Sequence, residues 1–154
     1  MKIKIVMLLF LVCFLQSCSW QEYFVITNET KSDIIIEYEI EMPASGFSIF
    51  NTNPLYYKLN SDGSIYWDET NNATDIDTAR LLVKIILPPN NGLVIGNLSN
   101  DNYKSYNQYF INGRHFNLKK LRIQNAETIT EINRPNFDTY FTKQKGLIEY
   151  RVKE

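Results

Sequence analysis

The clearest alternation of apolar and polar residues in the chain, over positions 34–41, most constrains the fold, with Ile35 as the one apolar residue on its polar face. Isoleucine or tyrosine occupies every even position, and glutamate occupies the odd positions from 37 onward. Because successive side chains of a strand point to opposite faces, this pattern predicts a strand with one buried face. Segments 80–87 and 148–152 show a similar alternation. Such strands are typical of antiparallel sheets that expose one face to water.

Shorter apolar runs add further strands at 23–27, 93–95 and 128–132, separated by polar or proline-containing turns. No long amphipathic helix is evident. The sequence therefore predicts an all-β protein, an antiparallel β-sandwich of immunoglobulin-like type with about seven to nine short strands, and a small barrel is the alternative. The predicted core comprises Val25, Ile34, Ile36, Tyr38, Ile40, Leu81, Val83, Ile85, Leu121, Ile123, Ile148, Tyr150 and Val152.

The segment 99–116 is compatible with two structures. Asn112-Gly113 is the residue pair that a two-residue hairpin turn prefers, because both positions need a positive φ. Tyr103, Tyr106 and Phe110, however, follow one another at helical spacing. The hairpin is slightly favoured. Further on, the apolar parity changes between Leu118 and Leu121, which predicts a bulge or a new strand near Lys119.

The N-terminus has the pattern of an export signal. Lys2 and Lys4 precede an apolar run of eleven residues from Ile5 to Leu15. A membrane-spanning helix needs about 20 such residues, whereas a run of this length fits a secretory signal peptide. The run ends in Leu15-Gln16-Ser17-Cys18, which resembles the lipobox of bacterial lipoproteins.

The resemblance implies that a diacylglycerol group is attached to the Cys18 thiol and that a peptidase cuts before this residue. Residues 1–17 would then be a cleaved signal peptide, 18–22 the lipidated cysteine with a short tether, and 23–154 the β-sandwich domain. The expected location is the cell envelope, anchored to a membrane by lipid, with the outer membrane favoured because Ser19 follows the cysteine. The sequence is compatible with both the periplasmic face of the outer membrane and the cell surface.

Few residues suit catalysis or metal binding. The chain has one histidine and two cysteines. The resemblance places Cys13 in the cleaved signal peptide and lipid on Cys18, which leaves the mature domain without a free thiol. The acidic residues at 62–77 lack the spacing of an EF-hand, so a solvated loop is favoured over a calcium site. The net charge of −1 argues against a nucleic-acid binder. We therefore expect neither a catalytic residue nor a metal or other cofactor.

Tyr66 and Trp67 are the candidate partner-binding residues, because they follow a polar turn and precede a polar loop. Exposed aromatic rings give contact area at low entropic cost. Together with the weak resemblance of the strand pattern to small β-sandwich envelope lipoproteins of Gram-negative bacteria, this predicts a non-enzymatic binding or assembly module, whose partner is a glycan or an envelope protein. A periplasmic inhibitor or immunity-type lipoprotein, presenting the loop 68–78, is the alternative, and a hydrolase is the least favoured class.

Overall fold

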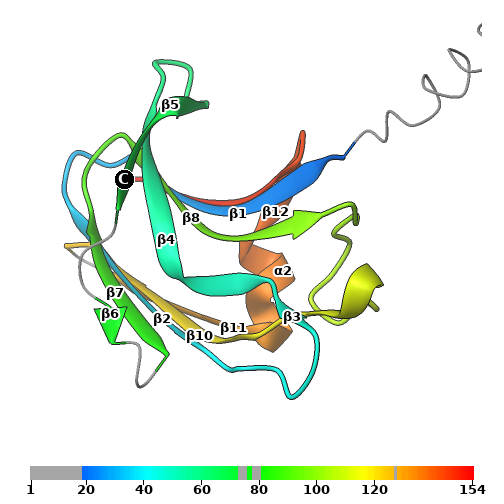
Figure 1. Cartoon of the computed structure of the whole chain (residues 1–154). Helices are drawn as coiled ribbons and strands as arrows, with labels where there is room; N and C mark the ends of the chain where they lie inside the picture. The colour runs from blue at the N-terminus through cyan, green and yellow to red at the C-terminus, as the bar shows by residue number, and fades with distance from the viewer. Residues whose placement is uncertain (1–18, 73–75, 78–80, 127) are drawn as a thin grey trace, which may run out of the picture.

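The computed structural model describes residues 19–72, 76–77, 81–126 and 128–154, and in this part of the chain nearly all regular structure is β (Figure 1). Two sheets pack against each other, which confirms the predicted all-β class and the sandwich arrangement. Nine of the strands have five or more residues, in line with the expected number. The others have two or three residues, too few to leave a periodic signal in the sequence.

A six-stranded sheet holds both the first and the last strand, in the order β12-β13-β1-β8-β4-β5. The closing strand runs parallel to β1, whereas the other pairs in this sheet are antiparallel. This departs from the purely antiparallel expectation, because hairpin signals fix the direction only of strands that are neighbours in the sequence. The strands are β1 (Gln21–Asn28), β4 (Phe50–Leu59), β5 (Ile65–Asn72), β8 (Asn91–Ser99), β12 (Thr142–Gln144) and β13 (Leu147–Val152).

The second sheet has five antiparallel strands in the order β11-β10-β2-β7-β6. These are β2 (Ile34–Ile40), β6 (Ile76–Asp77), β7 (Leu82–Leu87), β10 (Leu118–Gln124) and β11 (Ile129–Asn133). The predicted parity change near Lys119 is confirmed as a register shift between Leu118 and Lys120. The remaining elements are the parallel pair β3 (Phe47–Ser48) and β9 (Arg114–His115), the 3-10 turns η1 (Ile111–Gly113) and η2 (Arg134–Asn136), and the short helix α2 (Phe137–Tyr140).

The core between the sheets is rich in phenylalanine. The rings of Phe24, Phe50, Phe116 and Phe137 pack with centroid distances of 4.9–6.5 Å, mostly in tilted or edge-on geometry. None of these four was in the predicted core, because they lie outside the clearly alternating segments. Most of the predicted core residues are buried, whereas Leu81 and Tyr150 are only partly buried against the core, and Val25 belongs to a separate cluster.

The segment 99–116 is neither the favoured hairpin nor a long helix. Asn112 and Gly113 do adopt the predicted positive φ values, 59° and 65°. However, the following residues pair with β3, and not back onto the preceding chain. Two tertiary contacts explain this correction. The carboxylate of Asp101 accepts a hydrogen bond from the Ile111 backbone N–H at 2.7 Å, and Gly46 packs so closely on Gly113 that a Cβ would lie 2.0 Å from its carbonyl oxygen.

The outer face of the five-stranded sheet is largely charged. Lys84 pairs with Glu37 at 4.0 Å, Lys119 with Glu39 at 2.5 Å, and Lys120 with Glu131 at 2.9 Å. The hydrogen bond and charge of Lys120 hold the pKa of Glu131 below its usual value. Such exposed pairs contribute little stability, but their charged groups keep this face hydrated.

Two buried threonines near the end of β1 differ in one respect and allow a matched test. Thr27 Oγ1 is buried with no hydrogen-bond partner among the described residues, whereas Thr30 Oγ1 donates to Asn28 Oδ1 at 2.7 Å. We expect Thr27→Val to raise the free energy of unfolding by up to ~1 kcal/mol, because an unpaired buried hydroxyl is removed. Thr30→Val should lower it by about 1–2 kcal/mol. Urea unfolding would measure both. Equal effects of the two changes would contradict the assignment.

Candidate functional site

A second apolar cluster lies on the outer face of the six-stranded sheet. Val25 in β1, Tyr57 in β4 and Ile65 in β5 are buried there, away from the main core. Partly buried residues packed around them are Tyr23, Leu55, Leu59, Val94 and Leu147. Because side chains alternate along a strand, β1 contributes Phe24 and Ile26 to the main core and Val25 to this outer cluster. This part of the outer face is therefore apolar, and further along β13 the same face carries the ion pairs of Arg151 with Glu149 and Glu29.

Aromatic rings and a polar rim turn part of this face into a groove. The Trp67 ring lies 4.8 Å from the Tyr23 ring and 4.9 Å from the Tyr57 ring, measured between centroids. The groove has a volume of about 420 Å³ and runs between the β4–β5 hairpin and the β12–β13 turn. In Figure 1 the β4–β5 hairpin rises above the rest of the six-stranded sheet. The residues that line the groove include Gln21, Tyr23, Ser64, Trp67, Lys145 and Leu147.

The β12–β13 turn that forms one wall is tight. Gln144 pairs with Leu147, so only Lys145 and Gly146 connect the strands, with φ values of 47° and 83°. Positive φ at both positions is the signature of the turn that matches strand twist. The Gly146 carbonyl accepts a hydrogen bond from the Tyr23 backbone N–H at 3.0 Å. The turn is thereby fixed to β1, and Lys145 stays exposed at the rim.

The polar groups of the groove sit at its edge. Gln21, Ser64 and Lys145 are exposed, and the Tyr23 hydroxyl donates to the Gln21 side-chain oxygen. Burial raises the pKa of the Tyr57 hydroxyl, and the neighbouring Tyr23 raises it further, so this group stays protonated at neutral pH. The site thus offers ring faces at its floor and uncharged donors and acceptors, with one lysine, at its margin.

The two predicted partner-binding residues lie on opposite faces of β5. Trp67 joins the groove and is 42% exposed. Tyr66 is 39% exposed but is not among the groove residues, because consecutive strand residues point to opposite sides. The sequence reasoning missed Tyr23 and Tyr57 and the 145–146 turn. A tyrosine in an apolar run has the same sequence signal whether it packs inside the sandwich or on its outer face.

The acidic residues of 62–77 do not form a common site in the part of the chain that the structure describes. Asp62 Oδ1 accepts hydrogen bonds from the backbone N–H and hydroxyl of Ser64, at 3.0 and 2.6 Å, and the hydroxyl lowers its pKa. It therefore stabilises the turn that leads into β5. No group of three His, Cys, Asp or Glu side chains is placed to hold a metal ion among the described residues. The proposed inhibitory loop 68–78 lies partly outside them.

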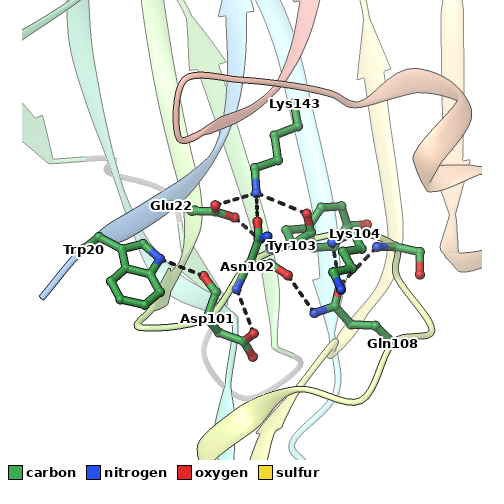
Figure 2. A network of polar contacts seen from close by, with 9 residues as sticks. Trp20, Glu22, Asp101, Asn102, Tyr103, Lys104, Gln108 and Lys143 are labelled. Carbon is green, nitrogen blue, oxygen red and sulfur yellow. Dashed lines mark hydrogen bonds and ion pairs between the residues drawn. The ribbon is translucent and has the colours of Figure 1, made fainter.

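A polar network closes the end of the sandwich where β1 begins (Figure 2). Glu22 is buried and pairs with Lys143 of β12 at 2.5 Å, while its other oxygen accepts from the Tyr103 backbone N–H at 2.8 Å. Lys143 also donates to the Asn102 side chain and, at 3.2 Å, to the Tyr103 carbonyl. The network joins β1, the loop after β8 and β12, and so it holds the strand that carries Gln21 and Tyr23.

No helix among the described residues has the length and apolarity needed to cross a membrane. Comparisons with family models, curated proteins and solved structures found no match for this chain.

Two lysines in ion pairs of different burial test the role of the network. We expect Lys143→Met to lower the free energy of unfolding by about 1–3 kcal/mol, because it leaves the buried Glu22 carboxylate without its cation. Lys31→Met breaks a fully exposed pair with Glu154 and should change stability by less than ~0.5 kcal/mol. Thermal or urea unfolding would compare them. A Lys143→Met protein as stable as the Lys31→Met control would show that the network does not stabilise the end of the sandwich where β1 begins.

Proposed function

We propose that the chain is a lipid-anchored cell-envelope protein that acts as a non-enzymatic binding module, and that its aromatic groove binds a short saccharide. The observation that carries this proposal is the contrast between the two outer faces. The face of the five-stranded sheet carries charge pairs, whereas the six-stranded sheet exposes aromatic rings in a groove. An exposed apolar patch with a polar rim is typical of a binding surface.

The shape and chemistry of the groove favour a saccharide. Its volume of about 420 Å³ falls within the range of small-ligand sites, about 300–1,000 Å³. Stable protein–protein interfaces involve about 20–30 residues on each partner, more than the eight residues that line this groove. A sugar ring presents C–H groups on its faces and hydroxyls at its edge. The rings of Trp67 and Tyr23 can pack on such faces, while Gln21, Ser64 and Lys145 can bond the hydroxyls.

The proposed anchor would bring this groove close to the bilayer. Gln21 at the groove follows Cys18 by three residues, so the two Cα atoms can be at most roughly 10 Å apart. One acyl chain binds a membrane only marginally, and two or three hold firmly, at about 0.8 kcal/mol for each buried CH₂. The proposed ligand is therefore an envelope glycan that lies next to the membrane, at the periplasmic face or the surface of the outer membrane.

The adjacent aromatic residues on β5 provide a matched test of the groove. The probe is an array of oligosaccharides of two to four units, including N-acetylated cell-wall fragments, followed by calorimetric titration of those that bind. We expect Trp67→Ala to raise the Kd at least ~10-fold, because the ring that packs on the sugar is lost. Tyr66→Ala, on the opposite face, should leave the Kd within about twofold.

Either of two results would overturn the saccharide assignment. The first is that no oligosaccharide binds the folded wild-type protein, while a protein partner is captured through Trp67. The second is that Tyr66→Ala weakens saccharide binding as much as Trp67→Ala does. Circular dichroism of both variants would verify that each retains the β structure of the wild type.

The anchor is tested separately at Cys18. We expect Cys18→Ala to release the protein from the membrane fraction or to leave its signal peptide uncleaved, because the thiol that would receive the lipid is absent. Cell fractionation and the mass of the purified protein would show which occurs. A Cys18→Ala protein that is fully processed and still membrane-bound would contradict lipid anchoring, whatever the outcome of the saccharide experiments.

A further inference from the structure

Three exposed apolar side chains lie on two segments that Asp101 links, the start of the described chain and the loop 101–113. Trp20 is 53% exposed, Tyr109 is 89% exposed and Ile111 is 51% exposed. Trp20 and Ile111 contact the same residue, Asp101. The Trp20 indole N–H donates to the Asp101 carbonyl at 3.2 Å, and the Asp101 carboxylate accepts from the Ile111 backbone N–H at 2.7 Å. Tyr109 is two residues before Ile111. We call these three side chains the Trp20 surface.

Trp20 is held in place although its ring faces solvent. Its backbone N–H donates to the Asn100 side chain at 3.2 Å, and its carbonyl accepts from the Asn100 backbone N–H at 3.0 Å. The indole hydrogen bond to Asp101 adds a third contact (Figure 2). A ring fixed in this way is presented to its surroundings in one orientation. It does not belong to a freely moving tether.

The loop that carries the other two side chains is also ordered. The Gln108 side chain accepts from the backbone N–H groups of Lys104 and Ser105, at 2.5 and 3.1 Å, and donates to the Asn102 carbonyl at 3.0 Å (Figure 2). Asp101, whose carboxylate bonds the Ile111 N–H, is itself buried. The loop thus holds the exposed Tyr109 and Ile111 at a fixed position on the domain, and Asp101 links it to Trp20.

The position of Cys18 identifies what meets this surface. Only Ser19 separates Cys18 from Trp20, so their Cα atoms lie at most about 7 Å apart. If Cys18 carries lipid, as the proposed function holds, Trp20 must lie at the headgroup level of the bilayer. Tryptophan and tyrosine favour this level because their rings are apolar at one end and polar at the other.

We propose that the Trp20 surface inserts into the headgroup region of the membrane and fixes the orientation of the domain on it. The lipid would then supply attachment and this surface would supply orientation. A fixed orientation would keep the groove, which begins one residue further along at Gln21, at a constant height above the bilayer. This inference rests on the proposed lipidation and is independent of what the groove binds.

Fluorescence quenching in liposomes tests the inference. The chain has two tryptophans, so Trp67→Phe leaves Trp20 as the only tryptophan. The full-length protein, purified with its lipid, is placed in phosphatidylethanolamine–phosphatidylglycerol vesicles with or without phospholipid brominated near the headgroup. We expect bromine to quench at least half of the Trp20 emission. In the same background, Tyr109→Ala with Ile111→Ala should reduce the quenching at least twofold.

Ile129 supplies the matched control, because it is 53% exposed and lies elsewhere on the domain. It begins β11 directly after Thr128, which lies with Thr30 beyond the end of β1 opposite to Trp20. Ile129→Ala should leave the quenching unchanged. In case a variant is unstable, hydrogen exchange of the wild-type protein gives a second readout. The reference is the same protein cleaved after residue 18, which frees it from the lipid, and measured without detergent. The backbone amides of 105–113 should exchange at least threefold more slowly in the vesicle-bound protein than in this released form.

The outcomes separate this inference from the proposed function. The inference is supported if the measured mass shows lipid on Cys18, bromine strongly quenches Trp20, and the amides of 105–113 exchange slowly in vesicles. Lipid on Cys18 with unquenched Trp20 overturns the inference and leaves the anchor intact. Slow hydrogen exchange at Trp20 that appears only in native membranes, and not in pure lipid vesicles, also overturns the inference, because the surface then binds a protein. Absence of lipid on Cys18 overturns the anchor and with it the inference.

Discussion

Strand β1 is buried on both of its faces, and the rest of the structure depends on this constraint. Phe24 and Ile26 pack between the two sheets, while Val25 packs on the outside of the six-stranded sheet. The same strand pairs with β13 on one side and β8 on the other. A strand of this kind needs apolar cover on two sides, so a sandwich of two sheets is not enough. The second cover comes from β4, β5 and the 145–146 turn, and these elements form the groove.

The same strand links the site to the end of the chain where Cys18 lies. Gln21 and Tyr23 line the groove, Glu22 closes the core through Lys143, and Trp20 rests on Asp101. Side chains that alternate along only four residues therefore reach three different environments. Burial of Glu22 would be costly without a cation, because an isolated carboxylate loses its hydration. The ion pair with Lys143 offsets this cost and ties the strand to β12, whose hairpin supplies the opposite wall of the groove.

The fold was predictable where a strand has one solvent-exposed face and one buried face. The alternation at 34–41 corresponds to β2, whose outward Glu37 and Glu39 pair with Lys84 of β7 and Lys119 of β10. Where strands are apolar on both faces, periodicity carries no information on direction or partner, so the parallel β1–β13 pairing was not foreseen. Asn112-Gly113 adopts the predicted backbone geometry, but contacts from Asp101 and Gly46 redirect the chain.

The candidate site was only partly predictable for a related reason. Trp67 was singled out from its position after a polar turn, and it lines the groove, whereas its neighbour Tyr66 points to the other face. The two tyrosines that meet Trp67 come from strands whose pairings contain register shifts, at Phe24/Val25 and at Tyr57/Leu59. At these two places the apolar pattern shows no parity change of the kind that revealed the shift near Lys119, so the shifts could not be read from the sequence. The lipobox resemblance, in contrast, is a purely local signal and needs no fold to be recognised.

The central claim is that the outer face of the six-stranded sheet is the binding face of this protein. Two-dimensional NMR of the uniformly ¹⁵N-labelled protein, titrated with the oligosaccharide that binds best, tests it most directly. We expect the shifted amides to map to 21–25, 64–68 and 144–147, with those of β2 and β10 unchanged. Shifts confined to the charged face of the five-stranded sheet, or to the loop 41–46, would contradict the claim.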